Sequence, residues 1–269
     1  MTEDKQLYQD PDPRINVLGV RVCVLTLDTT ADKVFKALDE ERRGYVTVTG
    51  VHGIVESLDD QDLLEIHNRS FLTTPDGMPL VWLGKAKGFS SQMERVYGPD
   101  LMWRLLSDSR MASWKQFLFG GALGVPELLA ETISRRFPSI DVVGSNSPPF
   151  RALTDREELE LVDGFRTLGV NILWVGLSTP KQERFMRGFL SRHAAKLPKP
   201  FICFGVGAAF DIHTGQTRQA PRWIQKAGLE FMFRALIEPR RLLPRYAKIV
   251  PRFLGELIIR GIRKEGLKS

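Results

Sequence analysis

The sequence has few of the features that mark secreted or membrane-spanning proteins. Its 269 residues include only two cysteines, Cys23 and Cys203, too few and too far apart for a disulfide framework or a cysteine metal cluster. The first residues, MTEDKQLYQDPDPR, contain no apolar segment typical of a signal peptide. No run approaches the roughly 18 apolar residues that a membrane-spanning helix needs. These absences predict a cytoplasmic protein that does not cross a membrane.

The charges are unevenly distributed along the chain. The net charge is +6, and 43% of the residues are hydrophobic, as in ordinary globular proteins. From Thr214 onward there are 13 Lys or Arg and 4 Asp or Glu residues, whereas the part before it has 25 and 28. The chain is therefore predicted to comprise a mildly acidic α/β domain, residues 1–213, and a basic C-terminal helical appendage, residues 214–269.

Short apolar runs alternate with helical patterns through the first domain. This alternation predicts an α/β fold with a Rossmann-like, largely parallel sheet flanked by helices. In such folds ligands bind at the carboxyl ends of the strands, where glycines and small polar residues fall in this sequence. A helix through Arg42 is expected to be capped by Thr30 or Asp32, and two more helices are expected at Val125–Arg136 and Asp155–Leu168. Strands are expected at Asn16–Leu27, Tyr45–Thr49, Gln116–Phe119, Ile140–Val143, Asn171–Val175 and Phe201–Phe204.

Two glycine-rich turns follow predicted strands. Gly120 and Gly121 open the turn GGALG before a helix, where bare N–H groups and a helix N-terminus favour an anion. A tight strand–helix connection explains the same glycines equally well. The later segment GVGAAF has Phe210 where a dinucleotide fingerprint needs Gly or Ala, so a dinucleotide site is rejected.

The segment 176-GLSTPKQERF-185 has the chemistry of a helix start. Thr179 as N-cap, Pro180 as the first helical residue and Gln182 as the third resemble a capping box. Lys181 and Gln182 would also lie beside a helix N-terminus at the end of a strand, where they suit a sugar or a phosphate. Both interpretations remain open at this point.

Two further polar residues lie close to turns. In 94-ERVYGPDLMWRLL-106, Asp100 is expected to cap the following helix, and Arg95 is either a solvated charge or a phosphate ligand. Asp76 lies in the turn Pro75-Asp76-Gly77, between two apolar stretches. It is either part of a turn only, or a base at the mouth of a pocket.

Taken together, these motifs resemble the WecG/TagA/CpsF family of bacterial glycosyltransferases. The resemblance covers about Val46 to Arg241, and the PKQE and APRW…GLEF…R…EPRR blocks are its most specific parts. The motifs are 46-VTVTGVHGIV-55, 74-TPDGMPLVW-82, 94-ERVYGPDLM-102, 117-FLFGGALGVPE-127, 173-LWVGLSTPKQE-183 and 205-GVGAAFDIHTGQTRQAPRWIQKAGLEFMFRALIEPRR-241.

The resemblance implies an inverting transfer of a sugar from a UDP-sugar to a saccharide linked to a polyprenyl diphosphate, typically undecaprenyl diphosphate. Members of the family build teichoic-acid linkage units, enterobacterial common antigen or exopolysaccharide in the bacterial cell envelope. Their donors carry N-acetylmannosamine, its uronic acid or glucose, so a hexosyltransferase is expected here. No metal and no other cofactor is implied, and the resemblance leaves a homo-oligomer open.

The resemblance also implies roles for individual residues. Asp76 matches the aspartate proposed as general base, and Thr47, Arg95 and Gln182 match positions of the substrate pocket. Thr49 replaces the asparagine that is common in the family, which bears on sugar recognition. Where many members have an arginine this chain has Gln219, so Arg218 or Arg222 is expected to supply a phosphate contact instead.

The C-terminal sequence after Ala227 alternates large apolar residues with Arg and Lys, and prolines interrupt it. This composition is typical of a helix at a membrane interface with anionic headgroups. A helix packed on the core is the plainer interpretation, and nucleic-acid binding is a third one that no known motif supports. In the resembled family this region docks on the membrane and helps to close the active site, which favours a peripheral location on the inner face of the cell membrane.

Two functions from different classes follow from the sequence. The first is an inverting, metal-independent glycosyltransferase with Asp76 as its base. The second is a non-catalytic protein on the same scaffold that binds a nucleotide-sugar or a polyanion. The donated sugar, the acceptor saccharide and the glycine loop that meets the diphosphate are left open.

Overall fold

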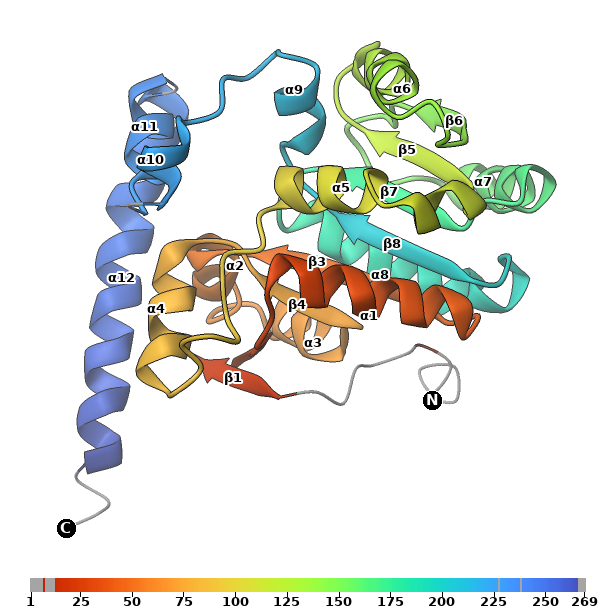
Figure 1. The fold of residues 1–269 in the computed structure, drawn as a ribbon. Coiled ribbons are helices and arrows are strands. Elements are labelled where there is room, and N and C mark those ends of the chain that lie inside the picture. Colours follow the sequence, from red (N-terminus) through yellow and green to blue (C-terminus); the bar gives the residue numbers. More distant parts are fainter. Residues whose placement is uncertain (1–6, 8–12, 227, 238, 266–269) are drawn as a thin grey trace.

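The centre of the molecule is a six-stranded sheet in which every paired neighbour is parallel (Figure 1). The computed structural model describes residues 7, 13–226, 228–237 and 239–265. The strand order is β4-β3-β8-β7-β5-β6, which confirms the predicted α/β fold with a Rossmann-like parallel sheet. The strands are β3 (Arg43–Thr49), β4 (Leu72–Pro75), β5 (Gln116–Gly120), β6 (Val142–Asn146), β7 (Ile172–Gly176) and β8 (Phe201–Gly205).

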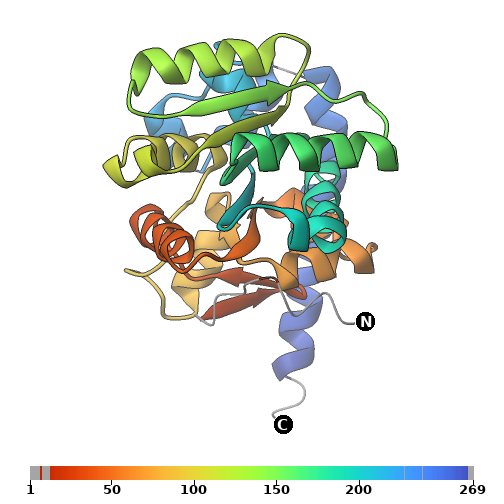
Figure 2. The same cartoon turned by 90° about the vertical axis from the view of Figure 1, so that its right-hand side faces the viewer.

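Helices cover both faces of this sheet, because its strands are apolar on both sides. In β7, Ile172 and Trp174 join one core cluster whereas Leu173 and Val175 join the other. Figure 2 shows the helices as two layers with the sheet between them. The first cluster includes residues of α1 (Leu27–Asp39), α5 (Gly98–Leu106), α6 (Val125–Arg136) and α9 (Ala209–His213), and the second those of α3 (Gln61–Arg69), α7 (Asp155–Leu168) and α8 (Lys181–His193).

A third apolar cluster lies at the side of β4. Residues of α2 (Val51–Glu56) and α4 (Met78–Ala86) pack there against a separate antiparallel hairpin. The hairpin comprises β1 (Arg14–Val17) and β2 (Val20–Cys23). The predicted single strand Asn16–Leu27 is therefore wrong: Leu18 and Gly19 adopt positive φ values and turn the chain back on itself. Two short 3-10 helices, η2 (Ser109–Ser113) and η3 (Ala194–Lys196), complete the connections.

Three predicted helix starts differ from the structure by a few residues. Thr26, not Thr30 or Asp32, caps α1 through a capping box with Thr29. Asp100 lies in the first turn of α5, and Tyr97 is the N-cap residue. The N-cap of α8 is Pro180, so the capping box expected from Thr179 does not form. In each case the apolar pattern located the helix, whereas its first turn begins a few residues from the predicted cap.

Three helices follow the α/β core: α10 (Arg222–Lys226), α11 (Glu230–Ile237) and α12 (Pro239–Glu265), here called the C-terminal helices. In Figure 1 they stand beside the end of the sheet to which the strand arrows point. Ile249 and Phe253 of α12 are buried in the third apolar cluster, against the hairpin, α2 and α4. None of the described helices is long and apolar enough to span a bilayer. The predicted boundary at residue 213 stays a prediction.

The packing of α12 predicts a difference between two neighbouring side chains. Phe253→Ala is expected to weaken the attachment of α12 by about 3 to 5 kcal/mol, because it removes a buried aromatic ring. Leu254→Ala is the matched control, because Leu254 is 52% exposed. Hydrogen exchange should be faster in α12 for the first variant and unchanged for the second. Equal exchange in both variants would contradict the packing described above.

Candidate active site

Asp76 lies at the carboxyl end of β4, on the edge of the sheet where ligands bind in α/β folds. Its backbone N–H donates to the Thr49 carbonyl at 2.9 Å, and the Val96 N–H donates to the Pro75 carbonyl at 2.9 Å. Gly77, with φ of 123°, lets the chain turn directly into α4. The Pro-Asp-Gly turn therefore joins a strand to a helix, and it holds Asp76 beside the end of β3.

A second glycine permits this close approach. A Cβ atom on Gly50, the residue after β3, would lie 2.5 Å from the Asp76 carbonyl oxygen. Any larger residue at position 50 would push the two strand ends apart. The position of Asp76 is thus determined by the backbone of two neighbouring parallel strands.

The Asp76 carboxylate faces Arg95. Arg95 Nη2 lies 3.5 Å from Asp76 Oδ1. The other end of the guanidinium, Nη1, lies only 2.6 Å from Oε2 of Glu230, the first residue of α11. The guanidinium also lies over the ring of Tyr97, 4.0 Å from its centroid. A carboxylate from the C-terminal helices therefore shares Arg95 with the predicted base.

Burial and charge act in opposite directions on the pKa of Asp76. Burial of the carboxyl is the largest influence and raises its pKa, although 29% of the side chain is still exposed. Arg95 and Arg234 lower the pKa, and Glu230 raises it. The net effect is a raised pKa, which suits a group that must accept a proton near neutral pH.

Two tyrosines and another carboxyl border the same charges. Burial raises the pKa of Tyr97, and its hydroxyl has no hydrogen-bond partner within the described part of the chain. Burial also raises the pKa of Tyr246 in α12, and the charges of Glu230 and Asp76 raise it further. Asp100 has a pKa raised by burial and senses the charges of Arg222 and Arg95. We call Asp76, Arg95, Tyr97, Glu230 and Arg234 the acid–arginine cluster.

Thr47 and Thr49 are buried at the end of β3 and face a histidine that the sequence analysis missed. His67 Nδ1 lies 3.0 Å from Thr49 Oγ1 and 3.2 Å from Thr47 Oγ1. The Thr47 hydroxyl also donates to Thr73 Oγ1 at 3.2 Å. Burial lowers the pKa of His67 to about 4, so its ring is neutral at pH 7. Both threonine hydroxyls have partners inside the protein, and their contact with a substrate stays a prediction.

Gln182 is buried and bridges two segments. Its amide donates to Glu183 Oε1 at 3.0 Å, and its oxygen accepts the Gly207 N–H at 3.1 Å. The Thr179 hydroxyl donates to the same Glu183 oxygen at 2.9 Å. Gln182 thus connects the first turn of α8 to the loop after β8, whose Gly205 pairs with Thr47. A substrate contact by Gln182 remains untested beside this structural role.

Gly120 ends β5 and Gly121 follows it, and their φ values are positive, 128° and 76°. A Cβ on Gly120 would lie 2.6 Å from the backbone of Gly176 in β7. The Gly121 N–H donates to the Gly176 carbonyl at 3.0 Å. The tight connection therefore accounts for both glycines, and a phosphate contact there stays a prediction.

The remaining predicted ligands are exposed cations. Lys181 begins α8, Arg218 lies in the loop after α9, and Arg222 begins α10. Of the three, Arg222 has an electrostatic effect next to the acid–arginine cluster, because its charge lowers the pKa of Asp100. The structure therefore brings together Asp76 and Arg95 directly, and places Arg222 at their border.

Glu230, Tyr97 and His67 are the residues that the sequence analysis did not single out. Glu230 and Tyr97 lie in the family motifs GLEF and RVYG, and this position in a motif was the sequence feature that could have identified them. His67 lies outside those motifs, in a helix whose pattern is otherwise ordinary. Its partners, Thr47 and Thr49, become its neighbours only when α3 packs on the sheet.

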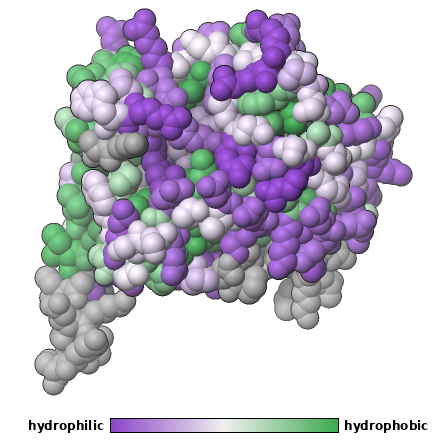
Figure 3. Space-filling model, in the orientation of Figure 1, coloured by the Kyte–Doolittle hydropathy of each residue, from purple (hydrophilic) through white to green (hydrophobic). Residues whose placement is uncertain are grey.

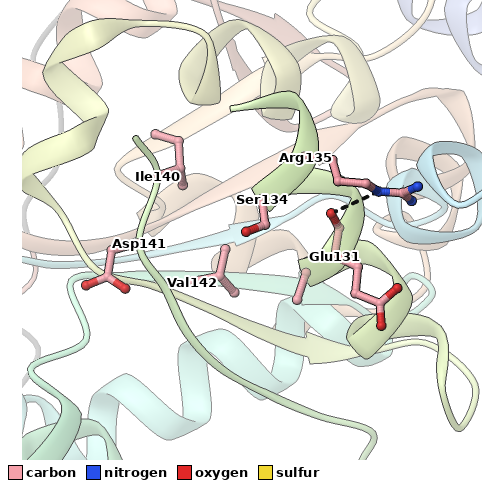
Figure 4. Close-up of a pocket in the computed structure, with 7 residues that line it drawn as sticks. Glu131, Ser134, Arg135, Ile140, Asp141 and Val142 are labelled. Carbon is pink, nitrogen blue, oxygen red and sulfur yellow. Dashed lines mark hydrogen bonds between the residues drawn. The ribbon is translucent and has the colours of Figure 1, made fainter. Parts of the chain in front are cut away.

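A surface pocket elsewhere in the molecule does not contribute to this site. It is lined by Glu131, Ser134, Arg135 and their neighbours at the end of α6, and by Asp141 just before β6 (Figure 4). That position is the amino end of a strand, opposite to Asp76. Across the described ranges, no group of three or more His, Cys, Asp or Glu side chains forms a metal-binding set.

Comparison with known protein families gives a match that covers most of the chain. Residues 15–266 match the model of the glycosyl transferase WecG/TagA/CpsF family. The matched region includes all six strands of the sheet, the acid–arginine cluster and the C-terminal helices.

The buried His67 predicts a pH-dependent stability. Its pKa is about 4 in the folded chain and 6.5 when exposed, so the unfolded state binds the proton more tightly. The buried neutral ring therefore contributes about 3 kcal/mol to the free energy of unfolding above pH 6.5, and this contribution should be lost as the pH falls from 6.5 to 4. Urea unfolding of wild type and His67→Asn at pH 7 and 4.5 measures the difference. An equal pH dependence of both proteins would contradict the prediction.

Proposed function

The chain belongs to the WecG/TagA/CpsF family of glycosyltransferases, and from that premise we propose that it is an inverting, metal-independent enzyme with Asp76 as the general base. The observation that carries the proposal is the position of the Asp76 carboxylate. It lies at the carboxyl edge of a parallel sheet, partly open to solvent, with a raised pKa and an arginine beside it. Such an environment is typical of catalytic acids and bases.

The proposed reaction uses one base. Asp76 takes the proton from a hydroxyl of the acceptor saccharide while that oxygen attacks the anomeric carbon of the donor. The bond from that carbon to the UDP oxygen breaks on the opposite face, which inverts the configuration. The proton ends on the Asp76 carboxyl and the electron pair on the leaving diphosphate.

Arginines are proposed to stabilise the charge that develops on the diphosphate. Arg95 is largely but not fully buried. Burial lowers its pKa, but Asp76 and Glu230 raise it above the usual value, so the guanidinium is charged. Its Nε has no hydrogen-bond partner in the described ranges. Arg222 and Arg218 are exposed on the chain that follows α9 and are available to a ligand at the same edge. Gly120, Gly121, Lys181 and Gln182 are further candidates for binding the donor.

The proposed substrates follow from the family. The donor is a UDP-sugar of the N-acetylmannosamine or glucose type, and the acceptor is a saccharide linked to a polyprenyl diphosphate in the synthesis of a bacterial surface polysaccharide. Thr47 and Thr49, held by His67, are proposed to shape the sugar subsite. A non-catalytic nucleotide-sugar or polyanion-binding protein is the alternative that the experiments below exclude or establish.

The C-terminal helices are proposed to attach the enzyme to the inner face of the cell membrane. Leu243, Val250, Leu254 and Ile258 of α12 are exposed and spaced so that they share one face. Apolar atoms accordingly gather on the side of the molecule formed by α12 (Figure 3). Arg245 and Lys248 are exposed on the same helix and suit anionic headgroups. The lipid-linked acceptor would then be reached from the membrane surface.

The assignment of Asp76 predicts the behaviour of Asp76→Asn. Incubation with a panel of UDP-sugars and a lipid-diphosphate acceptor, with detection of released UDP, should identify the donor for the wild type. The variant should lose about 10²- to 10⁴-fold in turnover, because the amide accepts no proton, and should still bind UDP. Asp62→Asn, at an exposed position on α3, is the control and should transfer at the wild-type rate. Undiminished transfer by Asp76→Asn would remove Asp76 from the role of base.

The exposed face of α12 predicts a change in membrane binding. Leu254→Ser together with Ile258→Ser should weaken flotation with anionic liposomes by about tenfold, because two large side chains no longer enter the interface. Leu159→Ser, which alters an exposed leucine on α7, is the control and should float like the wild type. Identical flotation of all three proteins would argue against attachment through α12.

A further inference from the structure

Glu230 is the member of the acid–arginine cluster whose role the proposed mechanism does not explain. It is a buried carboxylate at the first position of α11, whereas Asp76 and Arg95 belong to the segments that follow β4 and α4. A second acid beside a general base is costly unless it is paired, because both carboxylates are removed from water. The pairing of Glu230 therefore calls for an explanation.

The geometry shows how the two carboxylates divide one arginine. Arg95 Nη1 is 2.6 Å from Glu230 Oε2, an ion-pair distance, whereas Nη2 is 3.5 Å from Asp76 Oδ1, at the limit of a hydrogen bond. The ring of Tyr97 supports one face of the guanidinium. Arg95 is thus engaged by Glu230 and only weakly by Asp76.

The contacts of the C-terminal helices hold Glu230 in this place. Gly228, two residues earlier, lies so close to α4 that a Cβ would come within 2.9 Å of Met78 and 3.0 Å of Trp82. Farther along, Arg252 of α12 forms an ion pair with both oxygens of Asp59. Glu230 therefore reaches Arg95 only when these helices are packed on the core.

We propose that Glu230 is a positioning residue, which holds Arg95 away from Asp76 and so leaves the Asp76 carboxylate free to act as a base. The inference rests on the proposed function of Asp76. Without Glu230, the guanidinium would move onto the nearer free carboxylate and form a close ion pair with Asp76. The base would then be neutralised by its own neighbour. Packing of α11 thereby completes the site.

The charges around Asp76 determine the sign of the effect on its pKa. Arg95 and Arg234 lower the pKa of Asp76, and Glu230 raises it. Tyr97 and Tyr246, whose pKa values burial raises, are neutral in the working pH range, and Asp100 lies farther out beside Arg222. Replacing Glu230 by a neutral residue removes the acidic influence and strengthens that of Arg95, so both changes lower the pKa of Asp76.

The test is the pH profile of kcat/KM for the acceptor at saturating donor, measured for the full chain. In Glu230→Gln the acidic limb should move to lower pH by about one unit, and the plateau should fall on the order of tenfold, because a weaker base assists the transfer less. Glu230→Asp keeps the charge and should restore the position of the limb. Asp59→Asn removes the partner of Arg252 in an exposed ion pair, which contributes little to stability, so it should leave the limb at its wild-type pH.

The outcomes separate this inference from the proposed function. A shift in Glu230→Gln alone, reversed in Glu230→Asp, supports the positioning role. An acidic limb that does not shift in Glu230→Gln overturns the positioning role, whatever happens to the plateau. A plateau that falls equally in Glu230→Gln and Asp59→Asn would reflect only weaker packing of the C-terminal helices. Full activity in Asp76→Asn would instead refute the proposed function, and with it the premise of the inference.

Discussion

The parallel pairing of β3 with β4 on one side and with β8 on the other determines where the candidate site can form. Parallel strands end at the same edge, so Thr49, Asp76 and the loop after Gly205 come together although they are far apart in the chain. The approach of Gly50 to the Asp76 carbonyl and the bridge from Gln182 to Gly207 depend on this register. A slip of one residue would turn the threonines away from His67 and separate Asp76 from Arg95.

The acid–arginine cluster concentrates interacting charges at this edge of the sheet. Two carboxylates and two arginines share a small, partly buried volume, so the pKa values of Asp76 and Arg95 depend on the charges around them. Asp76 shares Arg95 with Glu230, and Glu230 lies closer to the guanidinium. This arrangement leaves a carboxylate with a raised pKa beside a charged guanidinium, which is the pair that the proposed reaction uses.

The two faces of α12 have different environments. One face of α12 buries Ile249 and Phe253 against the hairpin, α2 and α4, while Leu243, Val250 and Leu254 remain exposed. The plainer interpretation of the basic tail, a helix packed on the core, therefore holds for the first face. The second face keeps the composition on which the membrane proposal depends, so the two interpretations apply to different sides of one helix.

The sequence by itself determined the alternation of strands and helices and pointed to Asp76 and Arg95 as candidate site residues. The helices at residues 125–136 and 155–168 have the predicted bounds, because an apolar pattern with clear ends is a local property. Asp76 and Arg95 were found through motifs that keep their residue types in a recognisable order. Only the tertiary structure decided which residues share those groups: Glu230 with Arg95, and His67 with Thr47 and Thr49. These pairs join distant segments, and their distances depend on how helices pack on the sheet, which a local sequence pattern does not encode.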